Sequence, residues 1–201
     1  MKYILFILLI LPFLSFTQYD TVIHTKSFTS YYSKTLRLPV MVKYSLYKGG
    51  GNCNRKRDVF RNDYKVNVVG AKEFKASGYD EGHMANAEDF AYNCELQKST
   101  FQFINQLPQT PNLNRGTWKH YETIIRELSQ TDSLIIICGG LWEDNIAVNG
   151  MQIPNKCWKI VYSLHQKKLL YVLLFTNNAT ATVRELKNID ELHLKFKVSI
   201  P

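Results

Sequence analysis

Three short apolar runs in the second half of the chain constrain its fold most. They are SLIIICGG at 133–140, CWKIVYSL at 157–164 and KLLYVLLFTN at 168–177. Each run is short, continuous and rich in β-branched residues, so each predicts a buried strand. The last two meet at the polar residues HQKK, which predicts a hairpin. The second half of the chain is therefore expected to build the centre of a sheet.

Residues 40–48 predict a further strand with one buried face. Apolar side chains recur there at every second position, with more polar neighbours between them: Val40, Val42, Tyr44 and Leu46. The glycines of KGGGN at 48–52 then break the strand and predict a turn or a flexible loop. This loop lacks the Lys-Ser/Thr ending of a phosphate-binding P-loop.

The clearest helix begins at Asn114. Its apolar residues fall at spacings near 3.6, namely Trp118, Tyr121, Ile125 and Leu128. Asn112 or Asn114 is expected to cap the start of this helix. A shorter helix is predicted near the C-terminus, within 181–188 or 189–196. Because strands and helices are mixed without a regular βαβ alternation, the pattern favours an α+β fold over a doubly wound sheet.

The N-terminus predicts a signal peptide over residues 1–17. The apolar run YILFILLILPFLSF is too short and too interrupted by proline for a membrane span of about 20 residues. It ends in Ser15, Phe16 and Thr17, a small-x-small pattern like that of a cleavage site. The alternative is a retained anchor helix. Cleavage would leave residues 18–201 as a single domain, secreted or periplasmic, without a membrane partner.

The charge of the chain indicates an anionic partner or a surface tuned for solubility. The formal net charge is +8, and five basic residues are concentrated in NRKRDVFRNDYK at 54–65. Spaced bases with aromatic residues between them suit contacts with nucleic-acid phosphates. A solvated basic surface is the simpler interpretation of the same residues.

The cysteines agree with export, because four of them remain after cleavage and an even number suits an oxidising compartment. Three pairings are possible. Cys138 ends one predicted strand and Cys157 begins the next, so we expect these two to pair, and Cys53 to pair with Cys94. Four buried free thiols are the alternative. No C-x-x-C or H-E-x-x-H spacing indicates a structural zinc site.

One histidine lies among four carboxylates in GYDEGHMANAEDF at 78–90. Gly78 and Gly82 permit an unusual backbone path around His83, and neighbouring carboxylates can orient an imidazole or hold waters around a metal ion. A lone histidine is more often a structural donor. No G-x-S-x-G segment indicates a hydrolase nucleophile.

This segment and the one that follows it resemble the DNA/RNA non-specific endonucleases, the ββα-metal nucleases related to endonuclease G. The family motif reads Asp-Arg-Gly-His, then a hydrophobic strand ending in Asn with Pro-Gln nearby, then Asn-x-x-x-Trp and a Glu on a helix. The matching residues here are Asp80, Gly82, His83, Asn105, Pro108, Gln109, Asn114, Trp118 and Glu122. The resemblance extends more thinly over most of residues 40–180. One residue departs from the motif, because Glu81 stands where the family has arginine.

The resemblance implies an α+β fold with a mixed, mainly antiparallel sheet and a ββα-metal motif. It also implies a metal-dependent endonuclease that acts on DNA and RNA without sequence specificity. Asn114 would be the one direct protein ligand of Mg²⁺, with Mn²⁺ as the alternative ion. His83 would be the general base, for which its ordinary pKa of about 6.5 is suitable. Asp80 and Glu122 would hold waters around the ion, and Asn105 would fix the geometry of the site.

Substrate phosphates would be contacted by Arg57 or Arg61, which would supply the positive charge that Glu81 does not. Glu81 itself would either hold a water near the metal, which we favour, or pair with one of these arginines. A different class of function is a secreted nucleic-acid-binding protein whose nuclease site has decayed at Glu81. An extracellular glycosidase with paired acids would explain neither the single histidine nor the asparagines. The preference between DNA and RNA and the oligomeric state stay open.

Overall fold

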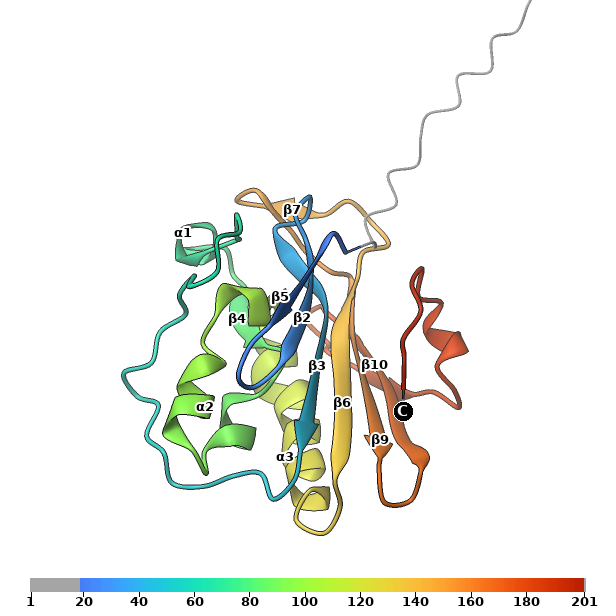
Figure 1. Cartoon of the computed structure of the whole chain (residues 1–201). Coiled ribbons are helices and arrows are strands. Elements are labelled where there is room, and N and C mark those ends of the chain that lie inside the picture. The colour runs from blue at the N-terminus through green and yellow to red at the C-terminus, as the bar shows by residue number, and fades with distance from the viewer. Residues whose placement is uncertain (1–18, 201) are drawn as a thin grey trace, which may run out of the picture.

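The computed structural model describes residues 19–200, so the predicted signal peptide lies outside the described residues. Its main feature is an antiparallel sheet of seven strands in the order β1-β2-β3-β6-β9-β10-β11 (Figure 1). The strands are β1 (Thr21–His24), β2 (Thr29–Ser33), β3 (Leu38–Leu46), β6 (Leu134–Leu141), β9 (Lys156–Ser163), β10 (Lys168–Thr176) and β11 (Val183–Glu185). A separate hairpin joins β7 (Ala147–Val148) to β8 (Met151–Gln152).

The four predicted strands are confirmed as β3, β6, β9 and β10. All residues of β6 are buried, as its continuous apolar sequence requires. The four inward residues predicted for β3 are also buried: Val40, Val42, Tyr44 and Leu46. The α+β class and the antiparallel sheet are likewise as predicted.

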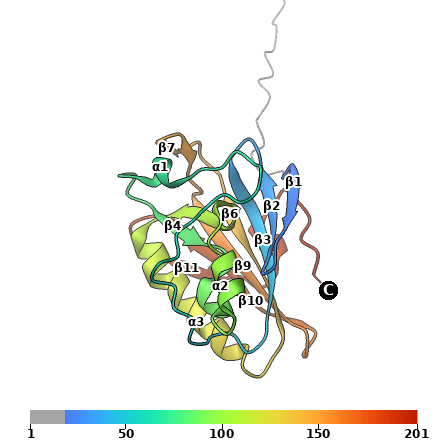
Figure 2. The ribbon, with the colours of Figure 1, turned by 60° about the vertical axis from the view of Figure 1, so that its left-hand side comes forward.

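Both faces of the sheet are covered. Helices α2 (Cys94–Ser99) and α3 (Lys119–Leu128) lie on one side, and the chain after β11 crosses the other side (Figures 1 and 2). A short helix α1 (Ala71–Phe74) and the 3-10 turns η1 (Ala87–Phe90), η2 (Phe103–Asn105) and η4 (Asp190–Leu192) complete the chain. Within residues 19–200, no helix is both long and apolar enough to cross a bilayer.

A two-stranded hairpin stands apart from the sheet and leads into α3. It consists of β4 (Asp80–His83) and β5 (Gln106–Gln109), which are antiparallel, with Gly82 opposite Leu107. The chain then passes through the π-helical turn η3 (Leu113–Trp118) into α3. Two strands followed by a helix give the ββα arrangement that the resemblance implied.

The short helix predicted near the C-terminus, within 181–188 or 189–196, is wrong. Part of 181–188 is strand β11, which pairs with β10, and only the single turn η4 forms within 189–196. The pairing supplies backbone partners that a short isolated helix would lack. The predicted cap is also absent, because the side chain of Asn112 binds the carbonyl of Ala179 and that of Asn114 binds Asp80.

One of the two predicted disulfides is present, and the other is not. The Cys53–Cys94 disulfide is confirmed and ties the loop after β3 to the start of α2. The predicted Cys138–Cys157 bond is wrong, since both thiols are free and buried. Cys138 is opposite Lys159 across β6 and β9, and Cys157 is opposite Gly140. The two cysteines are therefore diagonal neighbours on adjacent strands. The Cα atoms of such a pair lie about 7–8 Å apart, which is too far for a disulfide.

We predict that Gly82→Ala lowers the free energy of unfolding by about 1–3 kcal/mol. An added Cβ would lie 2.1 Å from Oε1 of Gln109, and the Gln109 side chain is fully buried and cannot swing away. Gly70→Ala is the matched control, because the backbone of Gly70 is extended and the nearest atom lies 3.7 Å from its Cβ position. Urea unfolding measures the loss, and adding Gln109→Ala should recover part of it. Equal stability of Gly82→Ala and the wild type would contradict the close packing.

Candidate active site

A cleft of about 530 Å³ opens where β4, η1 and α3 meet the loop after β3. Its lining residues are Arg55, Glu81, His83, Asn86, Glu88, Asn114, Arg115, Lys119, Glu122, Thr123 and Arg126. His83, Asn114 and Glu122, which lie far apart in the sequence, thus share one cavity. The hairpin supplies the first, the π-helical turn the second and α3 the third.

His83 is held between aromatic rings at the end of β4. Its ring centroid lies 4.5 Å from that of Phe60 and 4.7 Å from that of Phe101. Its Nε2 has no hydrogen-bond partner in the described part of the chain. Burial, with a smaller contribution from Arg55, lowers the pKa of His83 to about 3, well below the ordinary value expected from the sequence. The imidazole is therefore neutral at neutral pH, and this burial makes it a weak base.

Asn114 is oriented by Asp80. Its Nδ2 donates a hydrogen bond to Oδ2 of Asp80 at 3.0 Å, while its Oδ1 accepts none from residues 19–200. Arg115 binds the same carboxylate with two hydrogen bonds, Nε to Oδ2 at 2.8 Å and Nη2 to Oδ1 at 2.6 Å. Burial raises the pKa of Asp80, but these donors outweigh it and hold the pKa below its ordinary value. The amide oxygen of Asn114 is thus left available as a ligand.

Asn105 fixes the main chain that follows His83. Its Nδ2 donates to the carbonyl oxygens of Ala85 and Thr100, each at 2.9 Å, and its Oδ1 accepts from the amide of Ala85 at 2.8 Å. Its own carbonyl accepts from the amide of Met84 at 2.8 Å. The side chain is fully buried, so it supports the site without facing the cleft.

The carboxylates around His83 have separate partners. Asp80 binds Asn114 and Arg115, as described above. Asp89 is buried and accepts hydrogen bonds from Arg126 and Tyr44, each at 2.9 Å. Oε2 of Glu88 lies 4.0 Å from Nε of Arg55. Glu81 lines the cleft, and burial raises its pKa. Among the described residues it forms no ion pair, so the pairing of Glu81 with Arg57 or Arg61 is not observed.

The cations that reach the cleft differ from those predicted. Neither Arg57 nor Arg61 is among the described residues that line it, and Arg61 binds Asp63 at 2.6 Å. Their predicted contact with substrate stays a prediction. Arg55 and Arg115 line the cleft instead. Sequence reasoning missed both, although Arg55 lies in the basic segment and Arg115 follows the predicted ligand Asn114.

The polar lining fits a hard, hydrated divalent cation. The free Oδ1 of Asn114 and the carboxylates of Glu81, Glu88 and Glu122 are oxygen donors of the kind that Mg²⁺ prefers. Within residues 19–200, no group of three His, Cys, Asp or Glu side chains is placed to hold a metal ion together.

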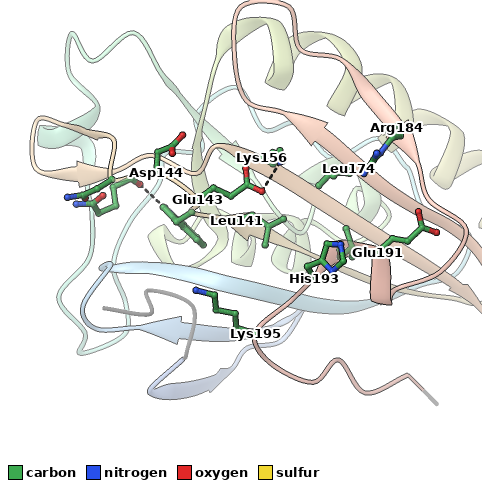
Figure 3. Close-up of a pocket in the computed structure, with 13 residues that line it drawn as sticks. Leu141, Glu143, Asp144, Lys156, Leu174, Arg184, Glu191, His193 and Lys195 are labelled. Atoms are coloured by element: carbon green, nitrogen blue, oxygen red, sulfur yellow. Dashed lines mark hydrogen bonds and ion pairs between the residues drawn. The ribbon is translucent and has the colours of Figure 1, made fainter. Parts of the chain in front are cut away.

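A second pocket, of about 580 Å³, lies on the opposite face of the sheet under the C-terminal segment (Figure 3). Leu141 and Leu174 form apolar lining, and charges of both signs surround them, including Lys156, Arg184 and Glu191. It contains none of the residues predicted to act on a substrate. Four of the predicted residues line the cleft beside β4 instead: Glu81, His83, Asn114 and Glu122.

Comparison with known proteins identifies the family and the fold. The model of the DNA/RNA non-specific endonuclease family matches residues 13–199. The chain belongs to this family. Its match with a nuclease of Nostoc sp. is 37% identical over 120 residues, 57% of this chain and 43% of the relative. Human mitochondrial endonuclease G is 29% identical over 93 residues, 45% of this chain and 31% of that protein.

These matches span less than half the length of the curated nucleases. A solved EndoG/EndoGI complex superposes with a TM-score of 0.68 at 23% identity, covering 79% of this chain and 75% of that chain. At this identity the likeness shows a shared fold. The endonuclease family is one of metal-dependent nucleases, which agrees with the oxygen-rich lining of the cleft.

We predict that replacing both Cys53 and Cys94 by serine lowers the unfolding free energy by about 4 kcal/mol, given the 41-residue separation of the two cysteines. The loop that carries Arg55 would also lose its tether, so KM for nucleic acid should rise more than kcat falls. Adding a reductant to the wild type should reproduce both effects. Non-reducing peptide mapping that linked Cys138 to Cys157, or stability unchanged by reductant, would contradict the assignment.

Proposed function

We propose that this chain is a metal-dependent endonuclease that hydrolyses phosphodiester bonds in DNA and RNA without sequence specificity. The observation that carries the proposal is the meeting of His83 and Asn114 in one cleft. The first offers a neutral imidazole whose Nε2 has no hydrogen-bond partner in the described residues, and the second offers an amide oxygen held in place through Asp80.

His83 acts as the general base that takes a proton from the attacking water. A bound divalent cation, Mg²⁺ with Mn²⁺ as the alternative, would offset charge on the phosphate and the leaving oxygen. Asn114 would hold that ion through Oδ1, and a neutral ligand leaves its charge unquenched. Asp80 and Glu122 would hold the water molecules around the ion. Because burial makes His83 a weak base, approach of the anionic phosphate is expected to raise its pKa and make it more effective.

The lining of the cleft suits a nucleic-acid backbone. Arg55, Arg115, Lys119 and Arg126 bring positive charge to it, and phosphate contacts give affinity without reading the sequence. The Arg115 side chain is 72% exposed although two of its N–H groups bind Asp80. Its remaining N–H groups can reach a phosphate, which would compensate for the carboxylate of Glu81.

Export from the cytoplasm is part of the proposal. The N-terminal apolar run favours a signal peptide. The Cys53–Cys94 disulfide supports it, because such bonds persist mainly in oxidising compartments.

The second candidate function is nucleic-acid binding without turnover. It is favoured by one observation, the carboxylate of Glu81 inside the cleft, which repels a phosphate. This reading keeps the basic surface and predicts complexes that are not cleaved. The two candidates are separated by an assay of cleavage.

We predict that the purified protein cleaves both plasmid DNA and RNA with Mg²⁺ and neither with a chelator. His83→Ala should lower the rate by about 10²–10⁴-fold, the usual contribution of a well-placed general base, and retain fold and DNA binding. The exposed histidine of α3 provides the control, His120→Ala, which should cleave normally. Binding without cleavage in the wild type would favour the decayed site. Normal cleavage by His83→Ala would remove this residue from the mechanism.

We predict that Asn114→Ala raises the Mg²⁺ concentration needed for half-maximal cleavage. The variant loses the amide oxygen that faces the cleft, whereas Asn114→Asp keeps an oxygen there and should be affected less. Asn112→Ala is the matched control, because its side chain binds the carbonyl of Ala179 and does not line the cleft. An unchanged Mg²⁺ titration for Asn114→Ala would place the ligand elsewhere.

A further inference from the structure

Lys159 is a buried cation directly behind the cleft. It lies in β9 with no exposed surface, and its Nζ has no hydrogen bond within the described residues. An unmatched buried ammonium is strongly unfavourable. Two groups face it, the carboxylate of Glu122, with Oε1 at 4.0 Å, and the ring of Trp118, with its centroid at 4.1 Å. Both groups belong to the helical part of the ββα motif.

The buried cluster around Lys159 contains equal numbers of positive and negative side chains. Asp89 and Glu122 supply two carboxylates, and Arg126 and Lys159 supply two cations. Asp89 is already bound by Arg126 and by the hydroxyl of Tyr44. Lys159 is therefore the cation left to match Glu122, which is itself only 8% exposed.

The two groups that Lys159 contacts both serve the cleft. Glu122 lines it together with His83 and Asn114. Trp118 donates a hydrogen bond from Nε1 to the carbonyl oxygen of His83 at 3.2 Å. One buried ammonium thus touches the carboxylate of α3 and the indole that anchors the end of β4.

We propose that Lys159 is a positioning residue, the buried counter-ion that keeps the carboxylate of Glu122 charged and in place beside His83 and Asn114. This role rests on the proposed nuclease function. Lys159 does not line the cleft, so it acts through Glu122 and Trp118 and not on the substrate.

The titration of Glu122 agrees with this geometry. Burial raises its pKa to about 7, and the charge of Lys159 is the largest effect that opposes the rise. Asp89 of η1 also raises the pKa, and Arg126 of its own helix and Asn86 before η1 lower it. Tyr44 of β3 and Cys138 of β6 are the other titratable groups that interact with Glu122. Removal of Lys159 would therefore raise the pKa further and leave Glu122 neutral at pH 7.

The raised pKa of Glu122 makes stability depend on pH. Its ordinary pKa is 4.5, so between pH 4.5 and about 7 the folded chain binds more protons at Glu122 than the unfolded chain does. Stability from this group is present below pH 4.5 and is lost as pH rises through 7. Without Lys159 the loss would continue to higher pH.

The test compares Lys159→Met, Glu122→Gln and the double variant with the wild type. We expect the acidic limb of the kcat profile of Lys159→Met to move up by about one pH unit. On that limb, a shift of one unit lowers kcat by up to about tenfold. Activity should recover at pH 9 with KM for DNA unchanged. Lys168→Met, an exposed lysine of β10, should behave as the wild type.

A second measurement does not depend on cleavage. Thermal unfolding from pH 5 to pH 9 should show a larger loss of stability for Lys159→Met than for the wild type. Glu122→Gln removes the carboxylate, so the double variant should lose this extra pH dependence and unfold at a higher temperature than Lys159→Met at pH 9. Its cleavage should stay as low as that of Glu122→Gln.

Each outcome bears on the proposal separately from the nuclease function. A wild type that cleaves, with an unshifted pH profile in Lys159→Met, would overturn it. So would stability that is rescued by Asp89→Asn in place of Glu122→Gln, because Lys159 would then serve Asp89. If Lys159→Met unfolds but the double variant folds, the pairing is supported. If neither folds, the lysine is needed for packing alone. Should the wild type cleave nothing, the stability comparison still decides the pairing.

Discussion

The geometry of the cleft depends on how Asn105 holds the main chain after His83. The hairpin that carries His83 is outside the seven-stranded sheet, so the sheet ladder does not fix its position. Buried hydrogen bonds from Asn105 to Ala85 and Thr100 take over that role. The thiol of Cys138 adds a contact from β6 to the carbonyl of Met84 at 3.2 Å. Polar groups buried in this way must be satisfied together, which makes the turn after β4 rigid.

Electrostatics in the cleft combine opposite demands. The proposed function requires that a nucleic-acid backbone and a hydrated cation both be attracted, so the lining needs bases and oxygen donors at the same time. The protein meets both needs by pairing carboxylates with arginines and leaving a neutral amide oxygen unpaired. Asp80 is bound to Arg115 and Asp89 to Arg126, and Oδ1 of Asn114 remains free for an ion. The carboxylates around His83 are therefore not a metal cluster, because most of them orient cations and amides.

Burial has different consequences for two titratable groups that line this cleft. His83 lies between phenylalanine rings, and desolvation keeps its imidazole neutral. Glu122 is also removed from water, but Lys159 and Arg126 oppose the resulting rise of its pKa. His83 is thus neutral, whereas Glu122 can still carry charge. Neighbours on β9 and α3 make this difference for Glu122.

The sequence by itself determined the central strands, because their apolar patterns are local and match the period of a pleated strand. It also determined the order of His83, Asn105, Asn114 and Glu122, whose spacing marks the endonuclease family. Only the tertiary structure placed Arg55 and Arg115 at the cleft and Lys159 behind it. It also turned 183–185 into an edge strand and left Cys138 and Cys157 diagonal and unpaired. These outcomes depend on strand register and on contacts between residues tens of positions apart. Local pattern carries no information on such contacts, so sequence could name the chemistry but not the counter-ions that sustain it.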